Sequence, residues 1–175
     1  MHFYSKNRDG ESFNEEEIEF FKNDKDVKNI ATGYQTSELL DTYMVGVTND
    51  EINKSLYKHT NDIKDNQIII NDILGRRENK KVGDTFTIAG KNLEIIEVIE
   101  TASISNYKMP MAIMELSMIH ELIGHSDTYM PNYLLLVCHD SAYCNIERGG
   151  GIVNRIWEHS QEYNISDQRE GGQYD

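Results

Sequence analysis

The sequence lacks a long apolar run. No stretch approaches the roughly 18 apolar residues that a membrane-spanning helix needs. It also begins without a secretory signal, because residues 1–8 contain neither an apolar core nor a cleavage site. We therefore expect the chain as given to be soluble, while a domain taken from a longer exported protein would look the same.

Basic residues are also scarce. The chain has 17 Lys and Arg against 30 Asp and Glu, so its formal net charge is 17 − 30 = −13. A surface of that charge repels the phosphates of nucleic acids and of anionic lipids. This composition excludes nucleic acid as a partner.

Only two cysteines occur, Cys138 and Cys144. Their spacing of six residues would close a small loop in an oxidising compartment. Spacing alone does not show that disulfide geometry is met, so two unlinked thiols are the favoured interpretation and a bridge stays open. A chain of 175 residues can bury roughly 70% of its unfolded surface on folding. It therefore does not need a disulfide to be stable.

The apolar pattern predicts short strands and short helices in irregular order. Residues 27–47 are rich in strand-forming residues, and a strand is expected to end at residue 47. Further strands are expected at residues 67–71, 85–88, 93–101, 111–114 and 133–138. Helices are expected at residues 15–22, 74–80, 116–123 and 152–163.

The four residues between the strands at 85–88 and 93–101 include Gly90, which favours a hairpin. The fold class is therefore α+β, a mixed sheet with hairpins and a few short helices. We divide the chain into a polar N-terminal segment (1–14), one α+β domain (15–166) and a flexible C-terminal tail (167–175).

One motif resembles the zinc-protease signature. His120, Glu121 and His125 are its candidate residues, but the two histidines are five positions apart. In the signature they are four apart, which brings both imidazoles to one face of the helix, whereas a spacing of five turns them about 140° apart. Surface or helix-end histidines are the favoured interpretation, and a zinc-dependent hydrolase is the weakest alternative.

The other constellations predict no reactive site. Asp24 and Asp26 begin like a calcium loop, but Asn29 and Gln35 stand where that loop needs Gly and Glu. The glycines of residues 148–151 favour a hinge, since no phosphate-binding pattern follows them. We therefore predict no catalytic residue, no cofactor and no metal ligand.

A resemblance to a known family rests on the order of several short motifs. These are Val45-Gly46-Val47-Thr48-x-Asp50, Ile68-Ile69-Ile70-Asn71, a short helix, Lys81-Val82-Gly83-Asp84-Thr85-Phe86-Thr87-Ile88 and Leu93-x-Ile95-x-x-Val98. In this order they resemble the extracytoplasmic core domain of ABC transporter permeases of the MacB/FtsX-like type. The similarity spans about residues 15 to 138, and residues 152–163 resemble the family's helix that returns to the membrane.

This resemblance implies a fold and a function. The fold would be two lobes, one inserted in the other. The function would be that of a non-enzymatic domain on the extracellular or periplasmic side of the cell membrane, which couples the movements of a membrane ATPase to a substrate or partner protein outside. The implied partners are an ATP-binding ABC subunit, an unknown extracytoplasmic substrate or protein, and a second copy of a membrane-embedded parent chain. A stand-alone extracellular binding module is the alternative.

Overall fold

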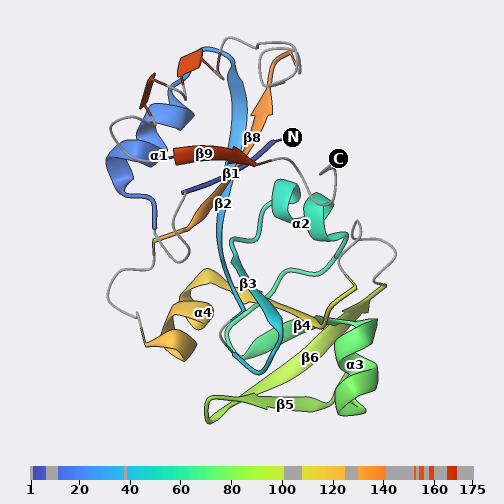
Figure 1. The fold of residues 1–175 in the computed structure, drawn as a ribbon. Coiled ribbons are helices and arrows are strands. Elements are labelled where there is room, and N and C mark those ends of the chain that lie inside the picture. The colour runs from blue at the N-terminus through green and yellow to red at the C-terminus, as the bar shows by residue number, and fades with distance from the viewer. Residues whose placement is uncertain are drawn as a thin grey trace. The chain divides into compact units, whose positions relative to one another are not determined.

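The structure is a computed structural model (Figure 1). It describes residues 2–6, 12–37, 39–100, 108–124, 130–140, 152, 154–155, 158–159 and 165–168. Within these residues, every helix is too short or too polar to cross a membrane.

The described residues form an α+β fold with a mixed sheet and short helices, as the sequence predicts. The strands are β1 (His2–Lys6), β2 (Val27–Thr36), β3 (Tyr43–Val47), β4 (Gln67–Asn71), β5 (Thr85–Ile88), β6 (Lys91–Ile99), β7 (Met111–Glu115), β8 (Tyr133–Cys138) and β9 (Ile165–Gln168). The helices are α1 (Glu15–Lys22), α2 (Glu51–Tyr57), α3 (Asp72–Glu78) and α4 (Leu116–Ile123).

The chain folds into two compact units, one inserted in the other along the sequence. Unit 1 comprises residues 1–32 and 130–175, and unit 2 comprises residues 33–129. Strand β2 begins in unit 1 and ends in unit 2. Each unit has a hydrophobic core of its own, because the two buried clusters share no residue.

Unit 2 is built on strands in the order β5-β6-β4-β7-β3-β2. The pairs β3–β7 and β4–β6 are parallel, while β2–β3, β4–β7 and β5–β6 are antiparallel. The β5–β6 hairpin turns at Ala89 and Gly90, both with positive φ, which confirms the predicted hairpin. In Figure 1 helix α3 lies beside this part of the sheet at the right.

Asn71 connects three elements of unit 2. Its side chain caps α3 by accepting from the backbone N–H of Leu74 at 2.9 Å. The same oxygen accepts from the N–H of Met111 at 3.1 Å, and the amide donates to the carbonyl of Met109 at 2.8 Å. Asn71 is buried, so these bonds satisfy a side chain that would be costly to bury alone.

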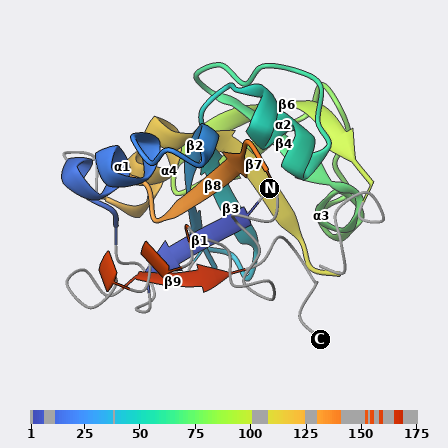
Figure 2. The same cartoon turned by 90° about the horizontal axis from the view of Figure 1, so that it is seen from above.

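Unit 1 is built on the order β2-β8-β1-β9. Strand β1 pairs antiparallel with β8 on one side and with β9 on the other, and Figure 2 shows β1 beside β9. The core contains Tyr4, Phe13 and Phe21, and the ring of Phe21 contacts the rings of both others. Strand β8 lies inside the sheet and its first four residues are buried, as its apolar run predicts.

Local signals explain where the predicted helices begin and end. Asn14 and Glu17 form a capping box at the start of α1, with bonds of 2.8 and 3.0 Å. Gly124 ends α4 with a positive φ of 80°. Strands β4, β5 and β8 and helices α1 and α4 have the predicted bounds, and β3 ends where a strand was predicted to end.

Four elements were not predicted. The sequence analysis expected one strand at the end of residues 27–47, whereas this segment forms two strands, β2 and β3. The sequence analysis assigned no strand to residues 1–14 or 167–175, yet β1 lies in the first segment and β9 extends into the second. It also assigned no helix to residues 51–57, where α2 forms. Of the predicted helix at residues 152–163, the described residues 152, 154–155 and 158–159 are helical.

Cys138, at the end of β8, is disulfide-bonded. The expectation of two unlinked thiols is therefore wrong for this residue. The other cysteine of the chain, Cys144, lies outside the described residues.

Gly46 on β3 is required by the close approach of α4. A Cβ atom at this position would lie 2.3 Å from Cγ2 of Ile119 and 3.0 Å from Cα of Leu116. We expect Gly46→Ala to lower the free energy of unfolding by about 1–3 kcal/mol, because the helix must move to admit the methyl group. Urea denaturation of the isolated chain measures this change.

Ile119→Ala supplies the control, since it removes the colliding Cγ2 atom. We expect the double variant to lose less stability than the sum of the two single variants. Strict additivity would contradict a direct collision between the two side chains.

Candidate functional site

In unit 1, an arginine near the end of the chain is held by two aspartates that precede β2. Arg155 donates from Nε to Oδ2 of Asp24 at 2.6 Å and from Nη2 to Oδ1 of Asp24 at 2.7 Å. Its Nη2 also contacts a carboxylate oxygen of Asp26. The Asp24 side chain is only 5% exposed. We call these three residues the arginine clamp.

The clamp has the geometry of a strong ion pair. A guanidinium that binds one carboxylate through two parallel bonds is fixed in orientation as well as attracted by charge. Burial alone would raise the pKa of Asp24, but the bonds from Arg155 and from the backbone of Asp26 lower it below 3.8. Asp24 is therefore ionised at neutral pH, and the pair stays charged.

A ring contact lies beside the clamp. The imidazole of His159 stacks on the ring of Phe20 with their centroids 3.8 Å apart and an interplanar angle of 5°. Phe20 belongs to α1, and it also contacts Phe21 of the unit 1 core edge to face. The helical residues Arg155 and His159 are four positions apart, so one face of this segment makes both contacts.

The clamp also lies at the start of β2. Val27, the first residue of that strand, donates from its N–H to the carbonyl of Asp24 at 3.1 Å. The carbonyl of Asp26 accepts from the N–H of His139 at 3.0 Å, just beyond β8. Arg155 therefore attaches residues near the C-terminal end of the chain to the backbone that leads into β2.

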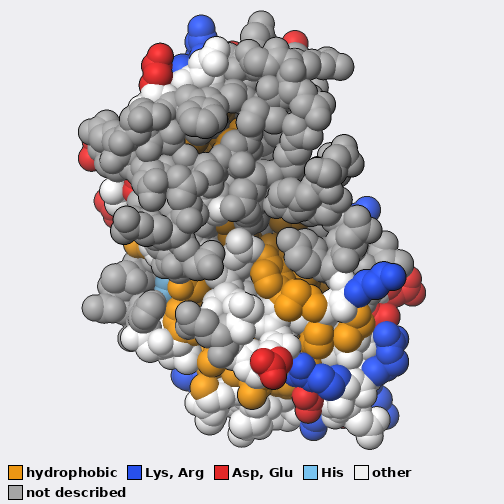
Figure 3. All heavy atoms as spheres, in the orientation of Figure 1, with side chains coloured by type: hydrophobic (Ala, Val, Ile, Leu, Met, Phe, Trp, Pro, Cys, Tyr) orange, Lys and Arg blue, Asp and Glu red, His pale blue; other side chains and the backbone are white. Residues whose placement is uncertain are grey.

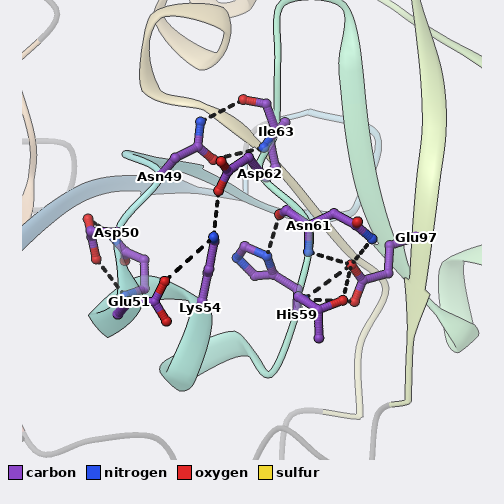
Figure 4. A network of polar contacts seen from close by, with 11 residues as sticks. Asn49, Asp50, Glu51, Lys54, His59, Asn61, Asp62, Ile63 and Glu97 are labelled. Carbon is purple, nitrogen blue, oxygen red and sulfur yellow. Dashed lines mark hydrogen bonds and ion pairs between the residues drawn. The ribbon is translucent and has the colours of Figure 1, made fainter.

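Unit 2 contains a second polar network, around the loop that joins α2 to β4 (Figure 4). Glu97 on β6 accepts from the backbone N–H groups of Thr60 and Asn61 at 3.2 and 3.1 Å and from the Asn61 amide at 2.7 Å. Burial would raise the pKa of Glu97, but these donors lower it below 4.5. One carboxylate thus fixes the loop to the sheet.

His59 is buried within this loop. Its Nδ1 faces the carbonyl of Asn61 at 3.2 Å, and its Nε2 is buried without a hydrogen-bond partner. Burial lowers the pKa of His59 below 6.5, which keeps the ring neutral at pH 7. Nearby, the Lys54 ammonium lies 2.5 Å from Asp62 and 3.7 Å from Glu51. These contacts hold the loop and supply no nucleophile next to a base.

The structure describes two of the three zinc-signature residues, and these two have different surroundings. His120 is buried on α4, with its ring 4.6 Å from that of Tyr34 between centroids. Glu121 faces solvent and pairs with Lys91 at 2.8 Å. His125 lies outside the described residues. Within the described part of the chain, no group of three metal-ligating side chains comes together.

The sequence analysis did not identify the arginine clamp. It singled out Asp24 and Asp26 as an incomplete calcium loop, so two of the three residues carried a visible signal. Their partner Arg155 is 131 residues from Asp24 along the chain. Nothing in the local pattern around Arg155 points to that pairing.

Comparison with solved structures shows which fold this is. The extracellular domain of the noncanonic ABC-type transporter YknZ from Gram-positive bacteria superposes with a TM-score of 0.61 and 14% identity over 97% of this chain and 99% of that one. The periplasmic region of MacB from Actinobacillus actinomycetemcomitans gives a TM-score of 0.58 and 7% identity over 97% and 88%. No protein-family model matches the chain, and no curated protein matches it in sequence. The chain has the fold of MacB-like extracytoplasmic domains, which confirms the resemblance seen in the sequence.

The Glu97 contacts predict a pH-dependent contribution to stability. We expect Glu97→Gln to lower the free energy of unfolding at pH 6 by about 1–2 kcal/mol, since it removes charge-assisted bonds. The folded-state pKa is lowered, so this contribution is complete above the unfolded-state pKa and is lost as the pH falls through the folded-state value. The gap in urea midpoint between the two proteins should therefore shrink between pH 6 and pH 3.

Glu94→Gln is the matched control, because Glu94 is exposed on the same strand. It should leave the midpoint unchanged at pH 6. A Glu97 gap that persisted at pH 3 would show that the carboxylate's charge is not the cause.

Proposed function

We propose that this chain is the non-enzymatic extracytoplasmic domain of an ABC transporter permease. It would couple the movements of a membrane ATPase to the binding of a substrate or partner protein outside the membrane. The observation that supports this proposal most is the fold, which matches two such domains over 97% of this chain. The insertion of unit 2 into unit 1 also supports this proposal, because the resemblance implied two lobes with one inserted in the other.

The arginine clamp would be the point where movement enters the domain. In a permease of this kind, the segment that carries Arg155 and His159 would lead towards a membrane helix. A displacement of that segment would pull on Asp24 and Asp26 through Arg155, and so on the start of β2. Because β2 continues into unit 2, a single strand would carry the displacement through the domain.

The remaining partners follow from the same proposal. They are a separate ATP-binding subunit, a second copy of the parent chain and an extracytoplasmic substrate or protein. The domain itself would lie at the outer face of the cell membrane.

The parent reading frame is the simplest test of this proposal. Membrane-length apolar segments on both sides of this chain would support a permease, and their absence would favour a stand-alone extracellular binding module.

The clamp can be tested in the full-length transporter together with its ATPase. We expect Arg155→Met to lower transport at least tenfold while ATP hydrolysis continues, because the segment at 152–159 loses its attachment to β2. In the isolated domain the same change should cost about 2–4 kcal/mol, since it leaves two largely buried carboxylates without their cation. Transport assays and urea denaturation measure the two effects.

A triple variant separates coupling from stability. Asp24→Asn and Asp26→Asn added to Arg155→Met remove the unpaired charges, so stability should recover while transport stays low. Arg76→Met, which removes an exposed arginine paired with Asp72, is the surface control. If transport recovered together with stability, the clamp would be a structural feature and not a transmitter.

A further inference from the structure

The loop between α2 and β4, residues 58–66, has only two buried side chains. These are His59 and Ile63, while every other residue of the loop is exposed. The hydrogen bonds from the loop to the Glu97 carboxylate are themselves exposed to solvent. A segment with few buried groups opens locally at a lower cost than a packed strand. His59 is therefore one of two buried anchors that decide whether this loop stays closed.

The site of His59 accepts only the neutral form of the ring. The side chain is 4% exposed, and its Nδ1 lies 3.2 Å from the carbonyl of Asn61. A carbonyl can only accept, so Nδ1 carries the single proton of the neutral imidazole. Nε2 has no hydrogen-bond partner among the described residues. A second proton would have to bind there, as a buried donor with no acceptor.

Charged groups face the ring from each element around it. Helix α2 contributes Asp50 and Lys54, strand β6 contributes Glu97, and the loop itself contributes Asp62. Figure 4 shows these side chains gathered around the imidazole. The carboxylates of Asp50 and Glu97 favour a protonated ring, and the Lys54 ammonium disfavours it. Burial outweighs the carboxylates, so the pKa of His59 is lowered while the loop is closed.

Opening the loop would expose the ring to water, where its pKa returns towards the ordinary value of 6.5. The open form then binds a proton before the closed form does, and the closed form loses stability as the pH falls through 6.5 towards the lowered value. We propose that His59 makes this loop an acid-released latch, which detaches from β6 when the surroundings become mildly acidic. This inference does not depend on the proposed transport role.

The other titratable contacts of the loop respond differently to pH. Glu115, at the end of β7, is hydrogen-bonded to Asp65 of the loop, and burial together with this bond raises its pKa. That contact weakens as the pH rises, which is the opposite direction. The bonds to Glu97 weaken only below pH 4.5. Opening between pH 7.5 and 5.5 therefore distinguishes His59 from both carboxylates.

The charged surface of unit 2 offers no second sensor for this pH range. Figure 3 shows acidic and basic side chains lying together around α3. Within this helix Arg76 pairs with Asp72, and Arg77 pairs with Glu78. Asp, Glu, Lys and Arg ordinarily titrate outside the range from pH 5.5 to 7.5. The other described histidine of unit 2, His120, is buried on α4 and not in the loop.

Hydrogen exchange of the intact chain at pH 7.5 and 5.5 tests the latch. Protection factors correct each rate for its intrinsic pH dependence, and those of Asn61 and Ile63 should fall about three- to tenfold at the lower pH. They should stay at least tenfold below that of Ile95, whose N–H donates to the carbonyl of Asp84 at 2.9 Å inside the sheet. Protection independent of pH, or equal at the three amides, would overturn the proposal.

Two variants and one titration identify the group responsible. His59→Gln cannot take up a proton, so protection at Asn61 and Ile63 should be the same at both pH values, whatever its absolute level. His139→Gln replaces an exposed histidine of unit 1 and should retain the full decrease. In the unsubstituted chain, an NMR titration of the His59 ring should have its midpoint below pH 6.5. A midpoint at or above 6.5, or a pH effect that survives His59→Gln, would overturn the proposal.

Discussion

The antiparallel pairing of β1 with β8 holds unit 1 together. The two strands come from opposite sides of unit 2 in the sequence. His2 pairs with Leu136 and Ser5 with Tyr133, so the first strand of the chain needs residues that are synthesised after all of unit 2. The backbone N–H of Phe13 donates to the carbonyl of Pro131 at 2.8 Å. This bond also joins a segment before unit 2 to a segment after it. Contacts of such long range are expensive in chain entropy and slow to form. The core of unit 1 and the arginine clamp likewise join residues that lie before unit 2 in the sequence to residues that lie after it.

Polar side chains have different roles in the two units. In unit 2, the amide of Asn71 and the carboxylate of Glu97 fix loops and helix ends to strands. Each of the two side chains accepts hydrogen bonds from two backbone N–H groups. In unit 1, Arg155 binds carboxylates across distant parts of the chain. The bonds of Glu97 hold one loop against a strand, whereas the ion pair of Arg155 joins segments 131 residues apart in the sequence. The second kind is the better candidate for function in a domain that shows no reactive centre among its described residues.

How far the sequence predicts this structure depends on where each signal lies. The capping box of Asn14, the glycine after α4 and the apolar run of β8 are local, and the elements they define have the predicted bounds. Helix α2 was missed because its N-cap Asp50 was read as part of a turn, and its residues are largely polar. Strands β1 and β9 were missed because pairing, and not their own composition, makes them strands. The clamp could not be found at all, since its partners are set by the tertiary fold.

The insertion of unit 2 has an evolutionary consequence. Residues 33–129 form one continuous stretch of the sequence, while unit 1 comes from both sides of it. A recombination event that exchanges this stretch alters one lobe and leaves every residue of the clamp in place.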